Sequence, residues 1–127
     1  MLPTTIGTLN LMKLAVPNAI LFVLDPTNKE AVVPQYDGLV SRTDTCVSVG
    51  TQADVDGETE VSIGRTVPTD LELVFDGSIE TPGRSIAVWT SERTPIGRLD
   101  ELSPTTHFAI WVDDNKWPSQ VVVVVRD

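Results

Sequence analysis

The chain has few of the residues on which most enzyme active sites depend. Its 127 residues include one cysteine, Cys46, and one histidine, His107. Catalysis by a serine or cysteine nucleophile usually needs an adjacent histidine, and zinc sites combine several Cys and His ligands. Motifs for phosphate binding and the Gly-x-Ser-x-Gly motif of hydrolases are also missing. The sequence predicts no catalytic residue, metal or cofactor; a glycosidase-like carboxylate pair remains conceivable only because acids are plentiful.

Long hydrophobic runs and targeting signals are equally scarce. A single cysteine cannot form an intramolecular disulfide, and no apolar run approaches the roughly 20 residues that cross a bilayer. Residues 1–7 lack the basic start of a signal peptide. We therefore expect a cytoplasmic protein with no membrane association.

Basic residues are outnumbered. Nine Lys and Arg stand against 18 Asp and Glu, which gives a formal net charge of −9. Binding to nucleic acid is driven mainly by Lys and Arg at phosphates, so the composition argues against a nucleic-acid partner. Strong acidity suits either solubility alone or a basic protein partner.

Sequence patterns typical of helices are also few, and short strands dominate instead. Apolar segments rich in Val and Ile are separated by Pro, Gly, Asp and Asn, as in antiparallel sandwiches. Residues 96–102 are ambiguous between a 3₁₀ turn and an irregular strand. We predict a single all-β domain, residues 1–127, folded as an antiparallel two-sheet β-sandwich of about eight or nine strands. The expected strands are 8–16, 19–25, 39–42, 46–54, 58–65, 70–75, 85–90, 106–112 and 120–126.

Several of these strands are apolar at every position, most clearly residues 20–24 and 121–125. Successive side chains of a strand point to opposite faces, so both faces of these strands must be dry. A second sheet, long loops or another molecule must cover the second face. If copies of the chain supply the cover, Val121, Val123 and Val125 are candidate interface residues of a homo-oligomer.

The apolar alternation around Asp56-Gly57 predicts a β-hairpin. A three-residue loop, 55–57, with Gly57 left-handed keeps the apolar residues of strands 46–54 and 58–65 on one face. The same register gathers Asp54, Asp56, Glu58 and Glu60 near the opposite face.

These four carboxylates allow three interpretations. They form a solvated face that prevents edge-to-edge aggregation, a docking patch for a basic partner, or a calcium site. The early glycine and the missing bidentate Glu do not fit an EF-hand loop, which argues against calcium.

The tryptophans divide into two kinds. Trp89 and Trp111 lie within apolar runs and are expected to pack in the core across neighbouring strands. Trp117 lies in a turn beside Asp113-Asp114, where it either caps the sandwich or anchors a partner, since large rigid rings carry much interface energy.

The pattern from Ile20 to Arg126 resembles the competence-type inhibitors of DNA-entry nucleases and related immunity proteins. The resemblance lies in residues 21–25, in residues 47–51 before the Asp56-Gly57 turn, and in residues 109–113 and 117–121. It implies a small bacterial β-sandwich that is acidic and binds a basic nuclease, and it assigns no individual functional residue.

The sequence therefore favours a non-catalytic protein-binding module of inhibitor or immunity type. Its partner-binding residues are expected to be Asp54, Asp56, Glu58, Glu60 and Trp117. The alternative is a self-assembling structural subunit whose two-faced apolar strands pack against copies of itself.

Overall fold

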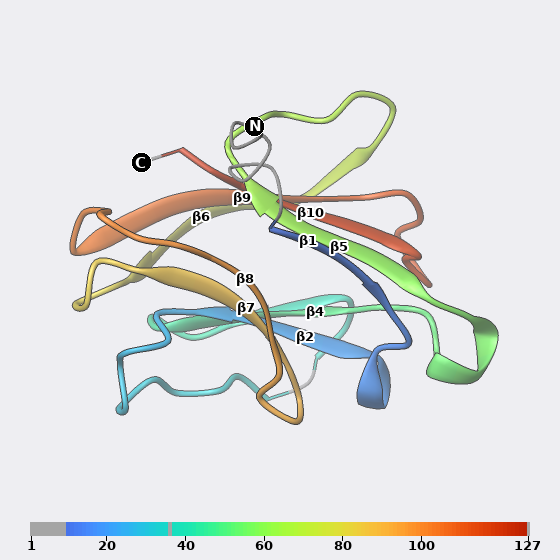
Figure 1. The fold of residues 1–127 in the computed structure, drawn as a ribbon, viewed down its shortest axis with the longest axis horizontal. Coiled ribbons are helices and arrows are strands. Elements are labelled where there is room, and N and C mark those ends of the chain that lie inside the picture. Colours follow the sequence, from blue (N-terminus) through green and yellow to red (C-terminus); the bar gives the residue numbers. More distant parts are fainter. Residues whose placement is uncertain (1–9, 36, 127) are drawn as a thin grey trace, which may run out of the picture.

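The chain folds into two stacked five-stranded sheets in a computed structural model that describes residues 10–35 and 37–126 (Figure 1). The first sheet has the order β1-β5-β10-β9-β6 and the second the order β3-β4-β2-β7-β8. The strands are β1 (Leu11–Leu14), β2 (Ile20–Leu24), β3 (Val40–Arg42), β4 (Cys46–Gly50), β5 (Thr59–Gly64), β6 (Glu72–Glu80), β7 (Ile86–Thr90), β8 (Pro95–Leu99), β9 (Thr105–Val112) and β10 (Gln120–Val125). Two 3₁₀ turns, η2 (Pro17–Ala19) and η3 (Asp54–Asp56), are the helical elements of the described residues.

This architecture confirms the predicted all-β sandwich, with ten strands instead of eight or nine. Residues 96–99 of the ambiguous segment belong to β8, and residues 100–102 follow it. Pairing is antiparallel except between β5 and β10, which run parallel. Residues 8 and 9 of the first expected strand lie outside the described part. No helix in that part is long and apolar enough to span a bilayer.

The core lies between the two sheets and is built by alternate residues of each strand. Val121, Val123 and Val125 of β10 belong to it and are almost completely buried. They face the other sheet of the same chain, so the folded protein does not offer them to a second copy. Their assignment as interface residues is corrected accordingly.

The second face of the β2 sheet is covered by a long loop. Leu21 and Val23 point into the core, so Leu24 and its partner Cys46 point away from it, yet both are buried. Residues 25–35 and 37–39, from the connection between β2 and β3, pass along this side of the sheet (Figure 1). The dry second face of β2 therefore comes from the chain itself.

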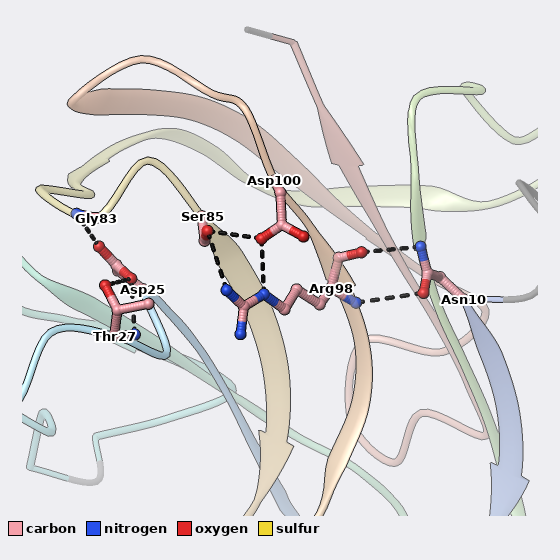
Figure 2. Close-up of polar contacts among 7 residues, drawn as sticks. All are labelled: Asn10, Asp25, Thr27, Gly83, Ser85, Arg98 and Asp100. Carbon is pink, nitrogen blue, oxygen red and sulfur yellow. Dashed lines mark hydrogen bonds and ion pairs between the residues drawn. The ribbon is translucent and has the colours of Figure 1, made fainter.

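Two sets of hydrogen bonds fix this loop. The buried Asp25 carboxylate accepts bonds from the Thr27 amide at 2.8 Å, from the Thr27 hydroxyl at 2.8 Å and from the Gly83 amide at 2.5 Å (Figure 2). Farther along, the Val32 amide donates to Thr45 Oγ1 at 2.8 Å. A buried carboxylate without donors would be costly, so these bonds stabilise the start of the loop.

The predicted hairpin at Asp56-Gly57 is wrong. Strands β4 and β5 lie in different sheets, and residues 51–58 cross from one to the other. Val49 and Ile63 nevertheless share the core, as the alternation requires, but they reach it from opposite sheets. Gly57 does take a positive φ of 128°, at the end of η3.

The open edges of the sandwich are joined by side chains. Asn10 donates from Nδ2 to the Arg98 carbonyl at 3.0 Å and accepts from the Arg98 amide at 3.3 Å (Figure 2). The Asn10 carbonyl also accepts from the Ile63 amide at 2.9 Å, which links β5 to β8. At the other edge, Arg42 Nη2 donates to the Ser78 carbonyl at 2.7 Å.

Arg98 also holds a polar cluster on β8. Its Nε lies 2.7 Å from Asp100 Oδ1, which accepts from the Ser85 hydroxyl at 2.7 Å (Figure 2). The hydrogen bond from Ser85 and the charge of Arg98 lower the pKa of Asp100 below its usual value. Arg98 and Asp100 are exposed, whereas Ser85 is buried, so the cluster joins the residues before and after the β7–β8 hairpin at the surface.

Candidate protein-binding surface

Two loops meet at one end of the sandwich, and we call this surface the acidic end. They are residues 51–58, between β4 and β5, and residues 113–119, between β9 and β10. The Gln52 amide donates to the Pro118 carbonyl at 2.8 Å, and the Glu60 amide donates to the Ser119 carbonyl at 2.9 Å. Gln52 Nε2 also donates to the Glu58 carbonyl at 2.9 Å. The first bond joins the two loops, the second joins the second loop to β5, and the third lies within the first loop.

The first loop presents carboxylates. The η3 turn is closed by bonds from the Asp56 amide to the Ala53 carbonyl at 2.9 Å and from the Gly57 amide to the Asp54 carbonyl at 3.3 Å. Asp54, Asp56 and Glu58 are all exposed on it. They lie together as the sequence predicts, although on an inter-sheet loop and not on a hairpin.

Glu60 has a different environment. It lies on β5, half-buried, and its Oε2 is 3.4 Å from Gln120 Nε2. Lys13 of β1 is its partner in the strand register. Glu60 therefore borders the acidic end from a strand, beside Lys13, and is less exposed than the loop carboxylates.

Apolar side chains stand among these acids. Trp117 is 69% exposed at the tip of the second loop, and Val55 is 87% exposed on η3. Trp117 does not cap the sandwich. An exposed tryptophan on a hydrogen-bonded loop is a good anchor for a partner because little conformational entropy is lost on binding.

Two aspartates organise the loop that carries Trp117. Asp113 accepts from the Ser119 hydroxyl at 2.5 Å and from the Ser119 and Gln120 amides at 2.9 and 3.0 Å. Asp114 Oδ1 accepts from the Lys116 amide at 2.8 Å and from the Trp117 amide at 3.4 Å. The sequence identified this stretch as turn chemistry, but it did not identify these two residues as the support of the site.

The hydrogen bonds at Asp113 also change its ionisation. Partial burial alone would raise the pKa of this carboxyl, but the bonds from Ser119 and Gln120 outweigh burial and lower the pKa below 3.8. Asp113 is therefore ionised at neutral pH. The acidic end then carries three carboxylates on its first loop and two on its second, against one lysine, Lys116.

The sequence suggested that Trp89 and Trp111 pack in the core, but in the structure they do not. Trp89 is opposite Phe22 on the outer side of one sheet, and Trp111 is opposite Leu73 on the outer side of the other. Both are only partly buried, and neither belongs to the core cluster. In a strand that is apolar at every position, the sequence does not show which face points into the core.

Cys46 and His107 lie in different sheets. Burial raises the pKa of the Cys46 thiol to about 12. His107 is exposed on β9, with Nε2 2.6 Å from Asp76 Oδ1. Across residues 10–35 and 37–126, no three His, Cys, Asp or Glu side chains are grouped so that they could hold a metal ion.

Comparison with known proteins adds evidence on the fold. No protein-family model and no curated protein matches the chain. Among solved structures, the chain is similar to the crystal structure of ComJ from Bacillus subtilis, an inhibitor of the DNA-degrading activity of NucA. The TM-score is 0.64 at 9% sequence identity, over 91% of this chain and 92% of that chain. The chain shares the fold of ComJ. The resemblance expected from the sequence is thereby confirmed for the fold.

Proposed function

We propose that this protein is a non-catalytic inhibitor that binds a basic protein partner through the acidic end. The observation that carries the proposal is the exposure of Trp117 and Val55 among five loop carboxylates on two loops that are hydrogen-bonded to each other. Aromatic residues at the centre of an interface supply affinity. Surrounding charges mainly speed encounter and select the partner.

A nuclease is the class of partner that we propose. The structurally similar ComJ inhibits a DNA-degrading protein. Proteins that bind DNA present Lys and Arg to its phosphates. An acidic surface can occupy such a site in place of DNA, which would make inhibition competitive with the substrate.

The alternative of a self-assembling structural subunit has less support. It depended on apolar strand faces left for copies of the chain, whereas β10 directs Val121, Val123 and Val125 into its own core. Part of the outer side of β2 is also covered by the chain itself, through residues 25–35.

Capture from host extract tests the proposal. Immobilised protein should retain a basic protein at low salt, and the eluted fraction should degrade DNA until the free inhibitor is added back. Trp117→Ala bait should lose that protein. Retention of the same proteins by both baits, or an eluate without DNA-degrading activity, would contradict the proposal.

Charge reversal tests the steering role of the carboxylates. With the captured partner, Asp56→Lys/Glu58→Lys should slow association about ten-fold and flatten its salt dependence. The matched control, Asp44→Lys/Glu80→Lys, makes the same change in net charge at exposed sites beyond the other end of β4. Equal association rates for the two variants would show that the carboxylates of the acidic end do not steer the partner.

A further inference from the structure

A pocket lies on the outer side of the second sheet. Its volume is about 480 Å³, within the range of roughly 300–1,000 Å³ that is usual for small-molecule sites. The floor is formed by Phe22 and Leu24 of β2 and Trp89 of β7, and residues 26–33 form one wall.

The charged residues that line this pocket are basic, whereas the molecule as a whole is acidic. Lys29 and Arg93 line it, and no acidic residue does, although acids outnumber bases two to one in the chain. Both side chains are exposed. Neither makes an ion pair or a side-chain hydrogen bond with the described residues, so both cations are available to a ligand.

The pocket is built before any ligand arrives. The Asp25 carboxylate ties one end of the wall to Gly83, and the bond from the Val32 amide to Thr45 ties the other. Phe22 and Trp89 are direct partners in the strand register, and both line the pocket. A preorganised site loses less entropy on binding.

Arg93 occupies a backbone conformation that disfavours it. Its φ is 62°, in the turn between β7 and β8, where Gly or Asn would be less strained. The turn is nevertheless closed by a bond from the Arg93 amide to the Thr90 carbonyl at 2.9 Å. The position thus holds a guanidinium at the pocket at some conformational cost.

We propose that this pocket binds a small carboxylate with an apolar, preferably aromatic, body. The ring would stack on Trp89 and Phe22, and the carboxylate would pair with Lys29 and Arg93. This site is independent of the partner-binding function proposed above.

The test compares two ligands of equal ring size, 2-naphthoate and the uncharged 2-naphthalenemethanol, followed by amide chemical shifts in NMR. Naphthoate should bind at least about ten-fold more tightly, a preference of the size expected for charge-assisted hydrogen bonds. Its shifts should centre on residues around Trp89. Equal affinities, no binding of naphthoate at a few millimolar, or shifts centred elsewhere would overturn the proposal.

Variants identify the groups responsible. Lys29→Ala/Arg93→Ala should abolish the preference for naphthoate and leave binding of the alcohol unchanged. The matched control, Lys13→Ala/Arg84→Ala, removes one lysine and one arginine outside the pocket, and Arg84 also has a positive φ, 59°. Loss of the preference in both double variants would contradict a local role.

A measurement on the unmodified protein keeps the test valid if a variant fails to fold. Raising the salt concentration from about 20 to about 500 mM should weaken naphthoate binding and leave the alcohol unaffected, because salt screens exposed charges. An identical salt response for both ligands would also contradict the proposal.

Discussion

Asp113 shows how one side chain can support a binding surface that it does not itself form. Its carboxylate closes the loop between β9 and β10 with bonds from Ser119 and Gln120, and Trp117 projects from that loop. Removing a hydrogen-bond acceptor from a partly buried donor costs more than the bond itself is worth, since the donor then lacks a partner.

We therefore expect Asp113→Ala to lower the free energy of unfolding by about 1–2 kcal/mol. The folded pKa of Asp113 lies below the ordinary 3.8. The stabilisation is therefore fully present above about pH 4 and is lost as the pH falls through the folded pKa. Urea titrations of wild type and variant between about pH 2 and 7 measure it, and the two stabilities should converge at the acid end.

Asp44→Ala is the control for this prediction. Asp44 is an exposed turn aspartate whose carboxylate accepts no hydrogen bond from the described residues. Its substitution should change stability by less than about 0.5 kcal/mol. A difference between wild type and Asp113→Ala that is constant with pH would show that the carboxylate's charge is not involved.

At the same scale, the sequence predicted only part of the candidate site. Asp54, Asp56 and Glu58 are adjacent in the chain and exposed, so local composition was sufficient to group them. That the loop of Trp117 meets their loop depends on the bond between the Gln52 amide and the Pro118 carbonyl. No local pattern encodes that long-range contact.

At the scale of the element, strand β8 approaches β5 and β1 closely at the joined edge of the sandwich. An added Cβ on Gly97 would lie 2.6 Å from Ile63 Cγ2 and 2.9 Å from Asn10 Cβ. Gly97→Ala should therefore destabilise the protein by about 1–3 kcal/mol through overpacking. Thermal or urea unfolding measures this change.

Gly64 on β5 provides the matched control. It is also a strand glycine, but an added Cβ there meets nothing within 4 Å. Gly64→Ala should be neutral or slightly stabilising, because alanine restricts the unfolded chain. Equal destabilisation by the two substitutions would show that the close approach at Gly97 is not the cause.

The loop between β2 and β3 should control access to Cys46. The thiol is fully buried, with a pKa raised to about 12, so a thiol reagent at pH 8 should react only after local opening. Asp25→Ala removes the acceptor that holds the start of the loop. We expect labelling by a disulfide reagent to accelerate ten-fold or more, about 1.4 kcal/mol in the opening equilibrium.

Glu30→Ala, an exposed substitution in the same loop, should leave the labelling rate of Cys46 unchanged. If both variants label at the wild-type rate, the Asp25 cluster does not limit opening. Rapid labelling of the wild-type protein would show instead that the loop does not protect the thiol.

The incorrect hairpin also belongs to this scale. The alternation of Val47 and Val49 with Val61 and Ile63 correctly identified residues of one core. It could not show that the two strands reach this core from opposite sheets, because period-two patterning reports which face is dry and not which strand is the neighbour. The parallel pairing of β5 with β10 was hidden for the same reason.

At the scale of the whole molecule, the all-apolar strands have an internal explanation. The first sheet covers one side of β2, and the chain's own loop covers part of the other. For β10, three of its five valines lie in the core. The fold class followed from the spacing of apolar segments and turns, whereas the origin of the cover required the three-dimensional path of residues 25–35.

Val123 distinguishes a core from an interface between copies. Its side chain is completely buried between the sheets. Val123→Ala should lower the free energy of unfolding by about 2 kcal/mol, the cost of deleting buried methyl groups and leaving a cavity.

Light scattering should give the same mass for variant and wild type, because the lost contacts lie within one chain. The midpoint of thermal unfolding should not depend on protein concentration for either protein, as it does when folding is coupled to assembly. A change of mass in the variant, or a midpoint that rises with concentration, would place this valine at a contact between copies.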